Sequence, residues 1–452
     1  MRNYKILPEE KKSILILSVI YFLRMTGMFM IVPVISIYGN HIKDTNEFLI
    51  GLSIGIYGIT QAFFQIPFGL LSDKFNQKIL IYIGLIIILI GSTISYICQS
   101  IKGIIFGRFL QGIGAISSPI MTLLFDLTRE HLHSKVISFI GFSIGLSFLC
   151  SIFLSFYIVN HFGIFNVFSL ISFLTFVSMI LLYFTPNSKK HIFNRETKII
   201  GNDLLKILFK KNIINLNISI FLLHLILMFS FLSIPLKLIA FNVSKFYNYK
   251  LYFLSILISF FISPLIISFC EKTKRIKKLF INSIIFIILS EIFIFYNLSE
   301  KFFIISGIQI FFISFNILEI LIPSLINKIC KAGYKGTAMG IYSTSQFFGV
   351  ALGGILGGYI LHNFEINYLF LTIIVLSIFW LFLIKNIPEP IYVSSVRIMI
   401  KNDLYNNLNI KNKLYKIKGI ISFLIIPEKN VIYLQIDENK VSVKKIKKLL
   451  KK

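Results

Sequence analysis

The chain has 452 residues, of which 56% are hydrophobic and only 14% are charged. Its mean hydropathy is +0.83. Soluble globular proteins average about 45–50% apolar and about 25% charged residues, so this composition excludes a water-soluble enzyme. The formal net charge is +27, from 46 Lys and Arg against 19 Asp and Glu. Two explanations of that excess stay open: an anionic partner, or drift in a genome that favours codons for Ile, Lys, Asn and Phe.

Twelve apolar runs divide the first 390 residues. Each is close to the 20 or so residues that a helix needs to cross a hydrocarbon core of about 30 Å. A polar, Lys-rich stretch at 185–212, with an amphipathic piece near 203–211, separates six runs from six. The sequence therefore predicts an all-α membrane protein with two six-helix bundles, at 1–184 and 213–390. The runs are 14–38, 49–71, 79–98, 103–126, 136–159, 164–184, 213–237, 251–270, 279–297, 302–326, 336–361 and 367–387.

Lys and Arg are unevenly distributed between the alternate loops of these runs. The side that carries the amino terminus and the 185–212 stretch has 23 of them, whereas the other side has about six. Because cytoplasmic loops are enriched in Lys and Arg, we expect both termini to be cytoplasmic and the protein to lie in a bacterial inner membrane. Codon drift would load both sides alike.

Residues 391–452 differ in character from the rest, with 14 Lys and Arg, four Asp and Glu, and no run long enough to span. Alternation at 395–400, 420–426 and 431–436 predicts strands, and 404–417 and 443–450 are helix-like. The order βαββα predicts a small cytoplasmic α+β, ferredoxin-like domain without its last strand. Its excess of ten positive charges leaves lipid headgroups, RNA or codon drift as explanations; we expect no nucleic acid partner.

Few ionisable residues lie inside the predicted spans. A charge at the centre of a span costs about 2.5–3.5 kcal/mol on insertion scales, so each needs a partner or a water-filled cavity. Arg24, Arg108, His224 and Glu319 fall one each on the first, fourth, seventh and tenth spans. Those spans are equivalent if each half contains two three-helix repeats, which predicts one shared cavity. Glu291, in the ninth span, is expected to reach the outer membrane surface instead.

Neutral polar residues on the same spans indicate the same cavity: Gln111 on the fourth, and Gln309 and Asn316 on the tenth. Within it, His224 and Glu319 are candidates for proton coupling, since imidazole titrates near neutral pH and a buried carboxyl holds its proton more tightly. A pair that only ties the cavity together is the alternative. Arg24 and Arg108 are expected to set the electrostatic potential of the cavity.

The four Cys residues (Cys98, Cys150, Cys270, Cys330) are widely spaced and include no CxxC pair, so the sequence indicates no metal site and no disulfide framework. No nucleotide-binding loop of the type G-x-x-x-x-G-K is present. We expect no cofactor and no enzymatic activity.

Two motifs stand out at the second and fourth spans. Residues 69–78 read Gly-Leu-Leu-Ser-Asp-Lys-Phe-Asn-Gln-Lys, and residues 108–115 read Arg-Phe-Leu-Gln-Gly-Ile-Gly-Ala. These runs, with the six-plus-six layout, resemble the motifs of the major facilitator superfamily. Residues 126–130 and 332–347 and the Glu-Pro junction at 389–390 resemble a bacterial branch of it that has a small carboxy-terminal domain.

The resemblance implies a proton-driven antiporter of the drug-efflux type that alternates between inward-open and outward-open states. It also implies a gating motif made of Gly69, Asp73, Lys74, Lys78 and Asp126. Asp73 is expected to face the start of the eleventh span near residues 336–337, where the helix dipole favours an anion, and to latch the two halves together.

Glycines support close packing of the second and eleventh spans. They are Gly51 and Gly55 on the second span and Gly349, Gly353, Gly354, Gly357 and Gly358 on the eleventh.

Two departures from the family pattern also matter. Asn76 and Gln77 stand where the superfamily usually has Gly and Arg, which leaves two alternatives: Asp126 uses Lys74, Lys78 or Arg129 instead, or the charge relay is weakened. Ser155-Phe156 stands where antiporters carry Gly-Pro.

Together these features predict a proton-coupled secondary active transporter of a small solute, working as an efflux antiporter. Its partners are the solute, protons and the lipid bilayer. Two alternatives stay open: a proton-coupled uptake symporter for a metabolite, and a membrane sensor that signals through residues 391–452.

Overall fold

The computed structural model describes most of the membrane part of the chain and three short strands after it. The described residues are 7–129, 132–186, 211–241, 243, 245–296, 301–329, 335–385, 393–399, 420–426 and 431–437. The predicted linker helix near 203–211 lies almost entirely outside them, as do the two predicted helices of the carboxy-terminal segment.

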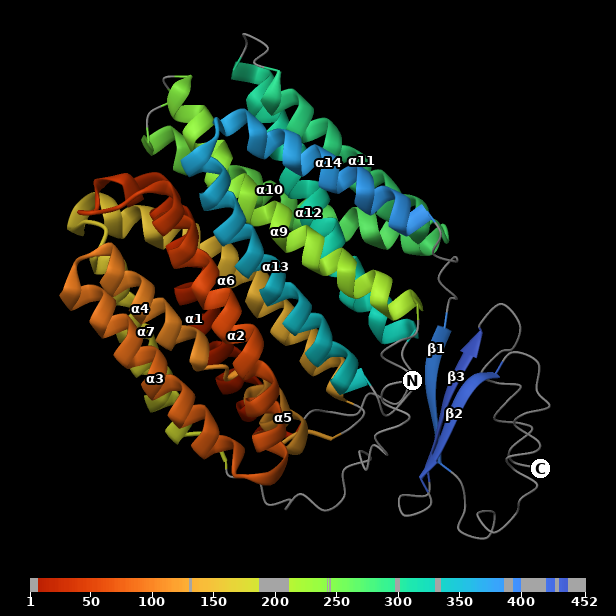
Figure 1. Cartoon of the computed structure of the whole chain (residues 1–452). Coiled ribbons are helices and arrows are strands. Elements are labelled where there is room, and N and C mark those ends of the chain that lie inside the picture. Colours follow the sequence, from red (N-terminus) through yellow and green to blue (C-terminus); the bar gives the residue numbers. More distant parts are fainter. Residues whose placement is uncertain are drawn as a thin grey trace.

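The described residues contain twelve helical spans, which confirms the predicted number. The two halves have matching layouts, since six spans lie on each side of residues 187–210 (Figure 1). The first half contains α1 (Pro8–Tyr38), η1 (Gly39–His41), α2 (Glu47–Lys74), α3 (Gln77–Cys98), α4 (Ile101–Ile113), α5 (Ser117–Asp126), α6 (His133–Phe162) and α7 (Asn166–Tyr183). The second contains α9 (Lys211–Ala240), α10 (Lys245–Lys272), α11 (Ile276–Phe295), α12 (Lys301–Ile329), α13 (Lys335–Asn363) and α14 (Ile366–Lys385).

The fourth span, predicted as one helix, consists of two helices with a break at residues 114–116. The break lies where this span packs against α3. A Cβ added at Gly114 would lie 2.7 Å from the carbonyl oxygen of Gly84, so only glycine fits there without a shift. The chain bends tightly, because Ala115 donates its backbone N–H to the carbonyl of Ile113 at 2.7 Å. The two short helices together cross the membrane once.

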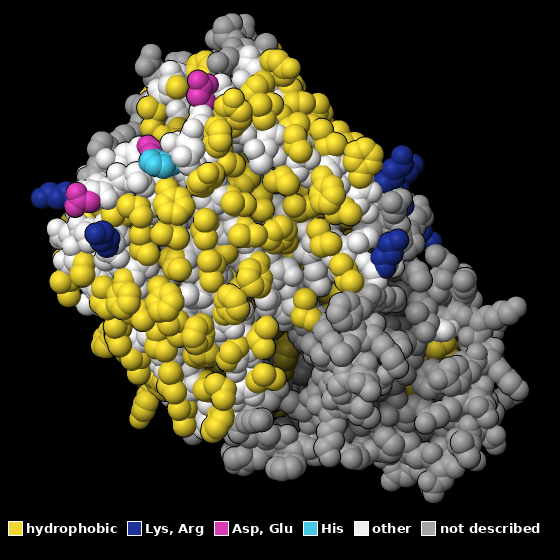
Figure 2. Space-filling view, in the orientation of Figure 1, with side chains coloured by type: hydrophobic (Ala, Val, Ile, Leu, Met, Phe, Trp, Pro, Cys, Tyr) yellow, Lys and Arg dark blue, Asp and Glu magenta, His cyan; other side chains and the backbone are white. Residues whose placement is uncertain are grey.

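Large apolar side chains cover the outside of the bundle. Phe63, Phe176, Phe261 and Phe382 are exposed on four different helices, and Figure 2 shows a nearly continuous apolar face with charged side chains at its margins. In a soluble protein such a patch would mark a binding site or an aggregation risk. Here it is the lipid-facing surface of a multi-pass membrane protein.

The two halves contact each other mainly through α2 and α13, with smaller contacts of α6 with α10 and of α1 with α9. We call the end of the bundle that carries the loop 39–46 the distal end. The opposite end, where α1 begins, is the proximal end.

Three strands follow the membrane part: β1 (Val393–Met399), β2 (Ile420–Ile426) and β3 (Val431–Asp437). They form an antiparallel sheet in the order β1-β3-β2. β1 pairs with β3 from Val393 opposite Asp437 to Met399 opposite Val431. The three predicted strands are therefore present, with the hairpin partners β2 and β3 adjacent in the sheet.

Candidate transport site

Arg24 lies in the middle of α1 and is only 8% exposed. Its guanidinium donates to Ser117 Oγ at 2.7 Å, to Gln61 Oε1 at 2.9 Å and to the hydroxyl of Tyr57 at 3.5 Å. Gln61 is held in turn by its own donation to Gln65 Oε1 at 3.0 Å. The α1 arginine is therefore solvated by neutral groups from α2 and α5 and not by an acid.

Arg108, on α4, is 1% exposed and contacts the same tyrosine. Its guanidinium carbon lies 4.1 Å from the centre of the Tyr57 ring, a cation–π contact. It also donates to the backbone carbonyl of Ser53 at 3.4 Å and to Gln111 Oε1 at 3.0 Å. Among the described residues no ion pair joins Arg24 or Arg108 to an acid. Two positive charges thus lie within the first half against one tyrosine, Arg24 at its hydroxyl and Arg108 over its ring.

Gln111 was expected to line the shared cavity. Instead it is buried between α4 and α3, where it accepts from Arg108 and donates to Ser92 Oγ at 2.9 Å. In this conformation it positions the arginine. Asn316 is half-buried on α12, and its Nδ2 has no hydrogen-bond partner. Gln309 donates to Ser255 and Ser259 of α10, so it joins two helices within the second half.

The second half brings together the two residues proposed for proton coupling. His224 Nε2 lies 3.7 Å from Glu319 Oε2. Gln346 of α13 bridges them, since its amide nitrogen lies 2.8 Å from His224 Nε2 and donates to Glu319 Oε1 at 3.3 Å. Three helices, α9, α12 and α13, therefore meet at one polar site. Gln346 was not among the predicted site residues, although it lies in the 332–347 run that carries the family resemblance.

The histidine tautomer follows from its neighbours. His224 Nδ1 lies 3.2 Å from the carbonyl oxygen of Ile220, which can only accept, so Nδ1 carries the ring proton. Nε2 is then the acceptor for the Gln346 amide. Both amide hydrogens of Gln346 are thus used, one toward the neutral imidazole and one toward the carboxylate.

The Glu319 side chain retains 27% exposure, whereas that of His224 retains 7%. Tyr342 of α13 lies beside the Glu319 carboxylate and within electrostatic range of Tyr21 on α1. Tyr21 is in turn close to Arg24 and Ser117. The four predicted residues therefore form two pairs, one in each half, with Tyr21 and Tyr342 between them.

The expectation for Glu291 was wrong. This residue is completely buried on α11, and it accepts from Ser230 Oγ of α9 at 3.1 Å. Its side chain points into the second half and not toward the membrane surface, because the rotation of α11 directs position 291 at α9. Sequence position along a span does not reveal that rotation.

Aromatic contacts close the distal end between the halves. Tyr249 of α10 stacks on Tyr38 of α1 with ring centres 6.2 Å apart, and its ring centre lies 4.8 Å from that of Phe156 on α6. His362 Nδ1 lies 3.5 Å from Glu47 Oε2, also across the halves. The described contacts between the halves thus include a seal at the distal end.

Glycines bring α2 and α13 into backbone contact. A Cβ at Gly55 would lie 2.6 Å from the carbonyl oxygen of Ala351, and one at Gly354 would lie 2.7 Å from the backbone nitrogen of Gly55. Gly51 packs against Gly358 in the same way. The predicted glycine interface is confirmed for these four residues. The other three predicted glycines, Gly349, Gly353 and Gly357, pack against α9 within the second half.

Comparison with known proteins agrees with this architecture. The family model described as Major Facilitator Superfamily matches residues 17–349 and 317–398. The chain belongs to the major facilitator superfamily.

Relatives and solved structures cover nearly the whole membrane part. The inner membrane transport protein YajR of Escherichia coli is 40% identical over 97% of this chain and 96% of its own length. An uncharacterized transporter of Buchnera aphidicola is 41% identical over 84% of this chain and 99% of its own length. Among structures, a mutant of the nucleoside transporter NupG superposes with a TM-score of 0.67 at 15% identity, over 82% of this chain and 99% of that one. The D-xylose-proton symporter reaches 0.65 at 14% identity, over 84% and 98%. These two likenesses concern the fold alone.

The superfamily's loop motif lies at the proximal end, between α2 and α3. Gln77, which replaces the usual Arg, donates from its amide to Asp126 Oδ2 at 3.1 Å and to the carbonyl of Ser72 at 3.2 Å. A neutral amide therefore occupies the place of the cation. Lys78 donates to the carbonyls of Tyr183 and Thr185, at 3.2 and 2.8 Å, and so caps the end of α7. Neither contact was predicted.

Two further parts of the motif can be compared with expectation. Gly69 lies against α5, since a Cβ there would lie 3.2 Å from Ser118 Oγ. Asp73 and Lys74 belong to the end of α2, but their side chains, like those of residues 336 and 337, lie outside the described part of the structure. The proposed latch stays a prediction.

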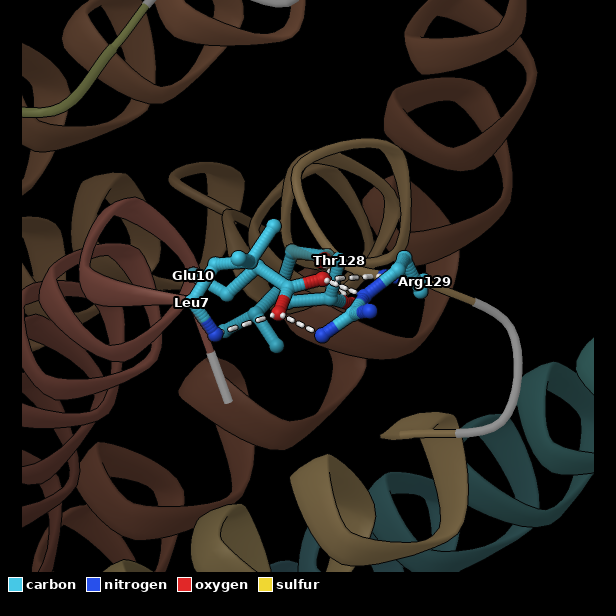
Figure 3. Close-up of polar contacts among 5 residues, drawn as sticks. Leu7, Glu10, Thr128 and Arg129 are labelled. Atoms are coloured by element: carbon cyan, nitrogen blue, oxygen red, sulfur yellow. Dashed lines mark hydrogen bonds and ion pairs between the residues drawn. The ribbon is translucent and has the colours of Figure 1, made fainter. Parts of the chain in front are cut away.

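An ion pair fixes the proximal end of α1 to the end of the fourth span (Figure 3). Arg129 Nε and Nη2 donate to Glu10 Oε1 and Oε2 at 2.7 and 2.9 Å, and the Arg129 backbone N–H donates to Oε1 at 3.1 Å. Glu10 also accepts from the backbone N–H of Leu7 at 2.9 Å, closing the first turn of α1. These bonds to Glu10 raise the pKa of Arg129. Arg129, considered above as a partner of Asp126, therefore holds Glu10.

We expect Arg129→Lys to lower the melting temperature of the purified protein, because an ammonium cannot reproduce the two parallel guanidinium bonds. Glu10→Gln should lower it further, since Arg129 would lose its counter-ion. Thermal unfolding in detergent measures both. Lys11→Gln, on an exposed neighbouring side chain of α1, is the control and should leave the melting temperature unchanged. Equal melting temperatures for all three variants and the parent would show that the pair contributes nothing.

Proposed function

We propose that this superfamily member is a proton-coupled secondary active transporter that exports a small solute in exchange for protons. The observation that carries the proposal is the His224–Gln346–Glu319 site, where three helices of the second half meet. Among the described residues, this is the site where a partly exposed carboxyl lies next to a second titratable group inside the membrane part. Because neighbouring helices contribute its members, a change of charge there alters the contacts between helices.

Proton binding would change the hydrogen bonds of this site in a defined way. An unpaired charge inside a membrane costs about 2.5–3.5 kcal/mol on insertion scales, so Glu319 favours either a bound proton or a nearby cation. If His224 Nε2 takes up a proton, it becomes a donor and can no longer accept from Gln346. The Gln346 amide must then turn, and the imidazolium pairs directly with Glu319. The site thus has two arrangements, which differ in how α13 is held.

Alternating access follows from the contacts between the halves. We propose that the proximal end faces the cytoplasm, as the excess of Lys and Arg in its loops indicates. The seal of Tyr38, Tyr249 and Phe156 then closes the external side. In the opposite state these contacts open and the proximal ends of α2 and α13 approach. Asp73, at the end of α2, would then face the start of α13 and latch the halves.

We expect Asp73→Asn to abolish transport without reducing the amount of folded protein. The neutral side chain keeps its size and loses the interaction with the helix dipole, which is worth up to about 2 kcal/mol in a partly buried contact, or roughly 30-fold in the population of the latched state. Solute flux in liposomes and size-exclusion chromatography measure the two properties. The matched control combines Asp73→Asn with Asn76→Asp, which moves the carboxylate three residues along the chain. This double variant should also lack solute flux. Full activity of Asp73→Asn would refute the latch.

The proposed exchange is tested with purified protein in liposomes that contain a pH-sensitive dye. A panel of solutes is added in turn under an imposed pH gradient. A solute that the protein exports should move protons in the opposite direction, and empty liposomes should show no movement. Solute flux that is indifferent to the pH gradient would refute proton coupling.

The two arginines of the first half favour a second candidate, uptake of an anionic metabolite together with protons. Arg24 and Arg108 have no acidic partner among the described residues, so an anion entering between the halves would meet uncompensated positive charge. Protonation of Glu319 removes the opposing negative charge, and proton and anion would then bind more tightly together than alone. Reversing the pH gradient distinguishes the candidates, since a symporter moves solute with the protons.

For residues 391–452 we propose a ferredoxin-like domain. The sheet order β1-β3-β2, with β1 and β2 on either side of β3, is the one that a split βαβ arrangement requires, and this supports the proposal. A sensor that signals through this domain is the remaining alternative. Removal of residues 391–452 distinguishes a transporter from a sensor. A transporter keeps its solute flux without these residues, whereas a sensor shows no solute flux with or without them.

A further inference from the structure

Glu291 lies in a second polar site of the second half, well separated along α11 from the proximal loops. It is completely buried, and a single hydroxyl, that of Ser230, donates to its Oε1 at 3.1 Å. Its Oε2 has no hydrogen-bond partner. Within the described part of the chain, no Lys, Arg or His forms an ion pair with it. A carboxylate in such a place would be uncompensated on one oxygen, so it needs a proton or a cation.

The neighbouring face of α10 carries further buried polar groups without partners. Both side-chain amide atoms of Asn248 and the hydroxyls of Tyr249 and Tyr252 have no hydrogen-bond partner, and all three residues are at most 2% exposed. Asn248 and Tyr252 lie one helical turn apart and so share a face. Tyr252 is within electrostatic range of both Glu291 and Tyr249. Buried polar groups are nearly always bonded, so this concentration of exceptions on α10 and α11 indicates a bound species.

One member of this group also belongs to the distal seal. Tyr249 stacks on Tyr38 and packs against Phe156, both of which belong to the other half. Tyr252 stacks in turn on Phe231, with ring centres 5.7 Å apart. When the halves separate at the distal end, Tyr249 loses its contacts with Tyr38 and Phe156 and becomes exposed. Tyr252 lies about one helical turn further along α10 than Tyr249 and is the one of the two within electrostatic range of Glu291.

We propose that Glu291 is a second proton-binding carboxyl of this transporter, loaded from the distal side when the Tyr38–Tyr249 contact opens and shielded when it closes. The inference rests on the proposed function, since it adds a site to the proton coupling assigned to Glu319. In the loading step an O–H bond forms at Glu291 Oε2, and a hydronium ion from the distal side gives up the proton and leaves as water.

The charged groups around Glu291 do not compete for this role. On α9, His224 and Lys237 lie on opposite sides of Ser230 along the helix, and Lys237 is engaged with Asn367 of α14 at 3.4 Å. On α10, Tyr249 and Tyr252 are buried, whereas the other titratable groups at this level, Tyr247 and Lys250, are exposed. On α12, Glu319 lies at the His224 site, and on α14 the lysine is Lys385 at the proximal end. Among the described residues, Glu291 is therefore the buried acid of the distal part of this half.

Infrared difference spectroscopy of the full chain in lipid, between acidic and alkaline pH, tests the assignment directly. We expect carboxyl C=O bands from two groups, one completely buried and one partly exposed. Glu291→Gln should remove one of them and Glu319→Gln the other, while Glu291→Asp should shift the first band without removing it. A difference spectrum unchanged by Glu291→Gln would overturn the proposal. So would a response of the Glu291 band to Na⁺ at constant pH, because the bound species would then be a cation.

Transport separates this proposal from the proposed function. Where both are right, Glu291→Gln lowers the number of protons moved per solute by one and leaves solute binding unchanged, whereas Glu319→Gln removes coupling. Loss of coupling in Glu319→Gln with an unchanged proton ratio in Glu291→Gln would refute only the second site. Intact coupling in Glu319→Gln, with the Glu291 band still responding to pH, would refute only the role of Glu319. Glu365→Gln, at an exposed acid near the distal end, is the matched control and should retain the proton ratio.

Discussion

Replacing Glu319 with Gln should abolish proton-driven flux in liposomes while the solute still binds. Glutamine has the size of glutamate and can accept from Gln346 through its amide oxygen, so the packing of α12 against α9 and α13 is retained. It cannot bind or release a proton in this pH range. Solute-dependent movement of protons should therefore fall to the level of empty liposomes, and binding, measured by thermal shift with the same solute, should stay within a factor of about two.

Glu365→Gln is the matched control for this change. Glu365 is exposed near the distal end and lies away from the His224 site, so the variant should transport like the parent. Gln346→Ala is a third variant with a distinct expected result. It keeps both titratable groups and removes the bridge, so flux should persist with an altered pH profile. Proton movement that survives Glu319→Gln undiminished would remove Glu319 from the mechanism.

The second large effect is expected from Gly354→Ala, which should hold the distal end open and stop transport. A Cβ there would lie 2.7 Å from the backbone nitrogen of Gly55 and 2.8 Å from the carbonyl oxygen of Gly51, both on α2. Backbone cannot move aside as a side chain can, so α2 and α13 must separate. Overpacking costs about 1–3 kcal/mol. A bias of that size changes the ratio of two conformations by roughly 5–150-fold. Because the contact joins the halves, folding of each half should be unaffected.

Two measurements establish the result. Spin labels on cysteines introduced at the exposed positions 43 and 364, one in each half at the distal end, should report a longer distance in Gly354→Ala than in the parent, both without the native cysteines. Gly340→Ala, on the same helix, is the control, since a Cβ there meets nothing within 4 Å. It should transport normally and keep the parent's distance. Normal transport by Gly354→Ala would show that this contact does not limit the conformational change.

The spans, their number and the division into halves were predictable because each depends only on local composition. A run of apolar residues crosses a membrane wherever its partners lie, whereas the break at residues 114–116 arises from close packing of Gly114 on Gly84 that composition does not reveal. The predicted strands of the carboxy-terminal segment follow from alternation in the same way. Their order in the sheet required the structure.

The ionisable residues of the candidate site were recognisable in the sequence, whereas their arrangement was not. Arg24, Arg108, His224 and Glu319 were recognisable because charge is expensive in a membrane, and that cost is a property of the residue type. Their grouping into two pairs, and the bridging by Tyr57 and Gln346, depend on how each helix is rotated about its axis. The same holds for Gln77, a neutral residue that holds Asp126, and for Glu10, which meets Arg129 from a distant part of the sequence.

The amino-acid composition and the tertiary structure determined different properties of this protein. The high hydropathy determined by itself that the chain is a membrane protein, since exposed apolar surface on twelve spans is stable only in lipid. The tertiary structure alone decided that Glu291 is buried and that Tyr249 seals the distal end. Burial of a side chain in a bundle is set by helix rotation and tilt, which depend on contacts between distant residues. Insertion into a bilayer is set by the apolar content of each segment separately, and for this reason the sequence alone was enough to predict it.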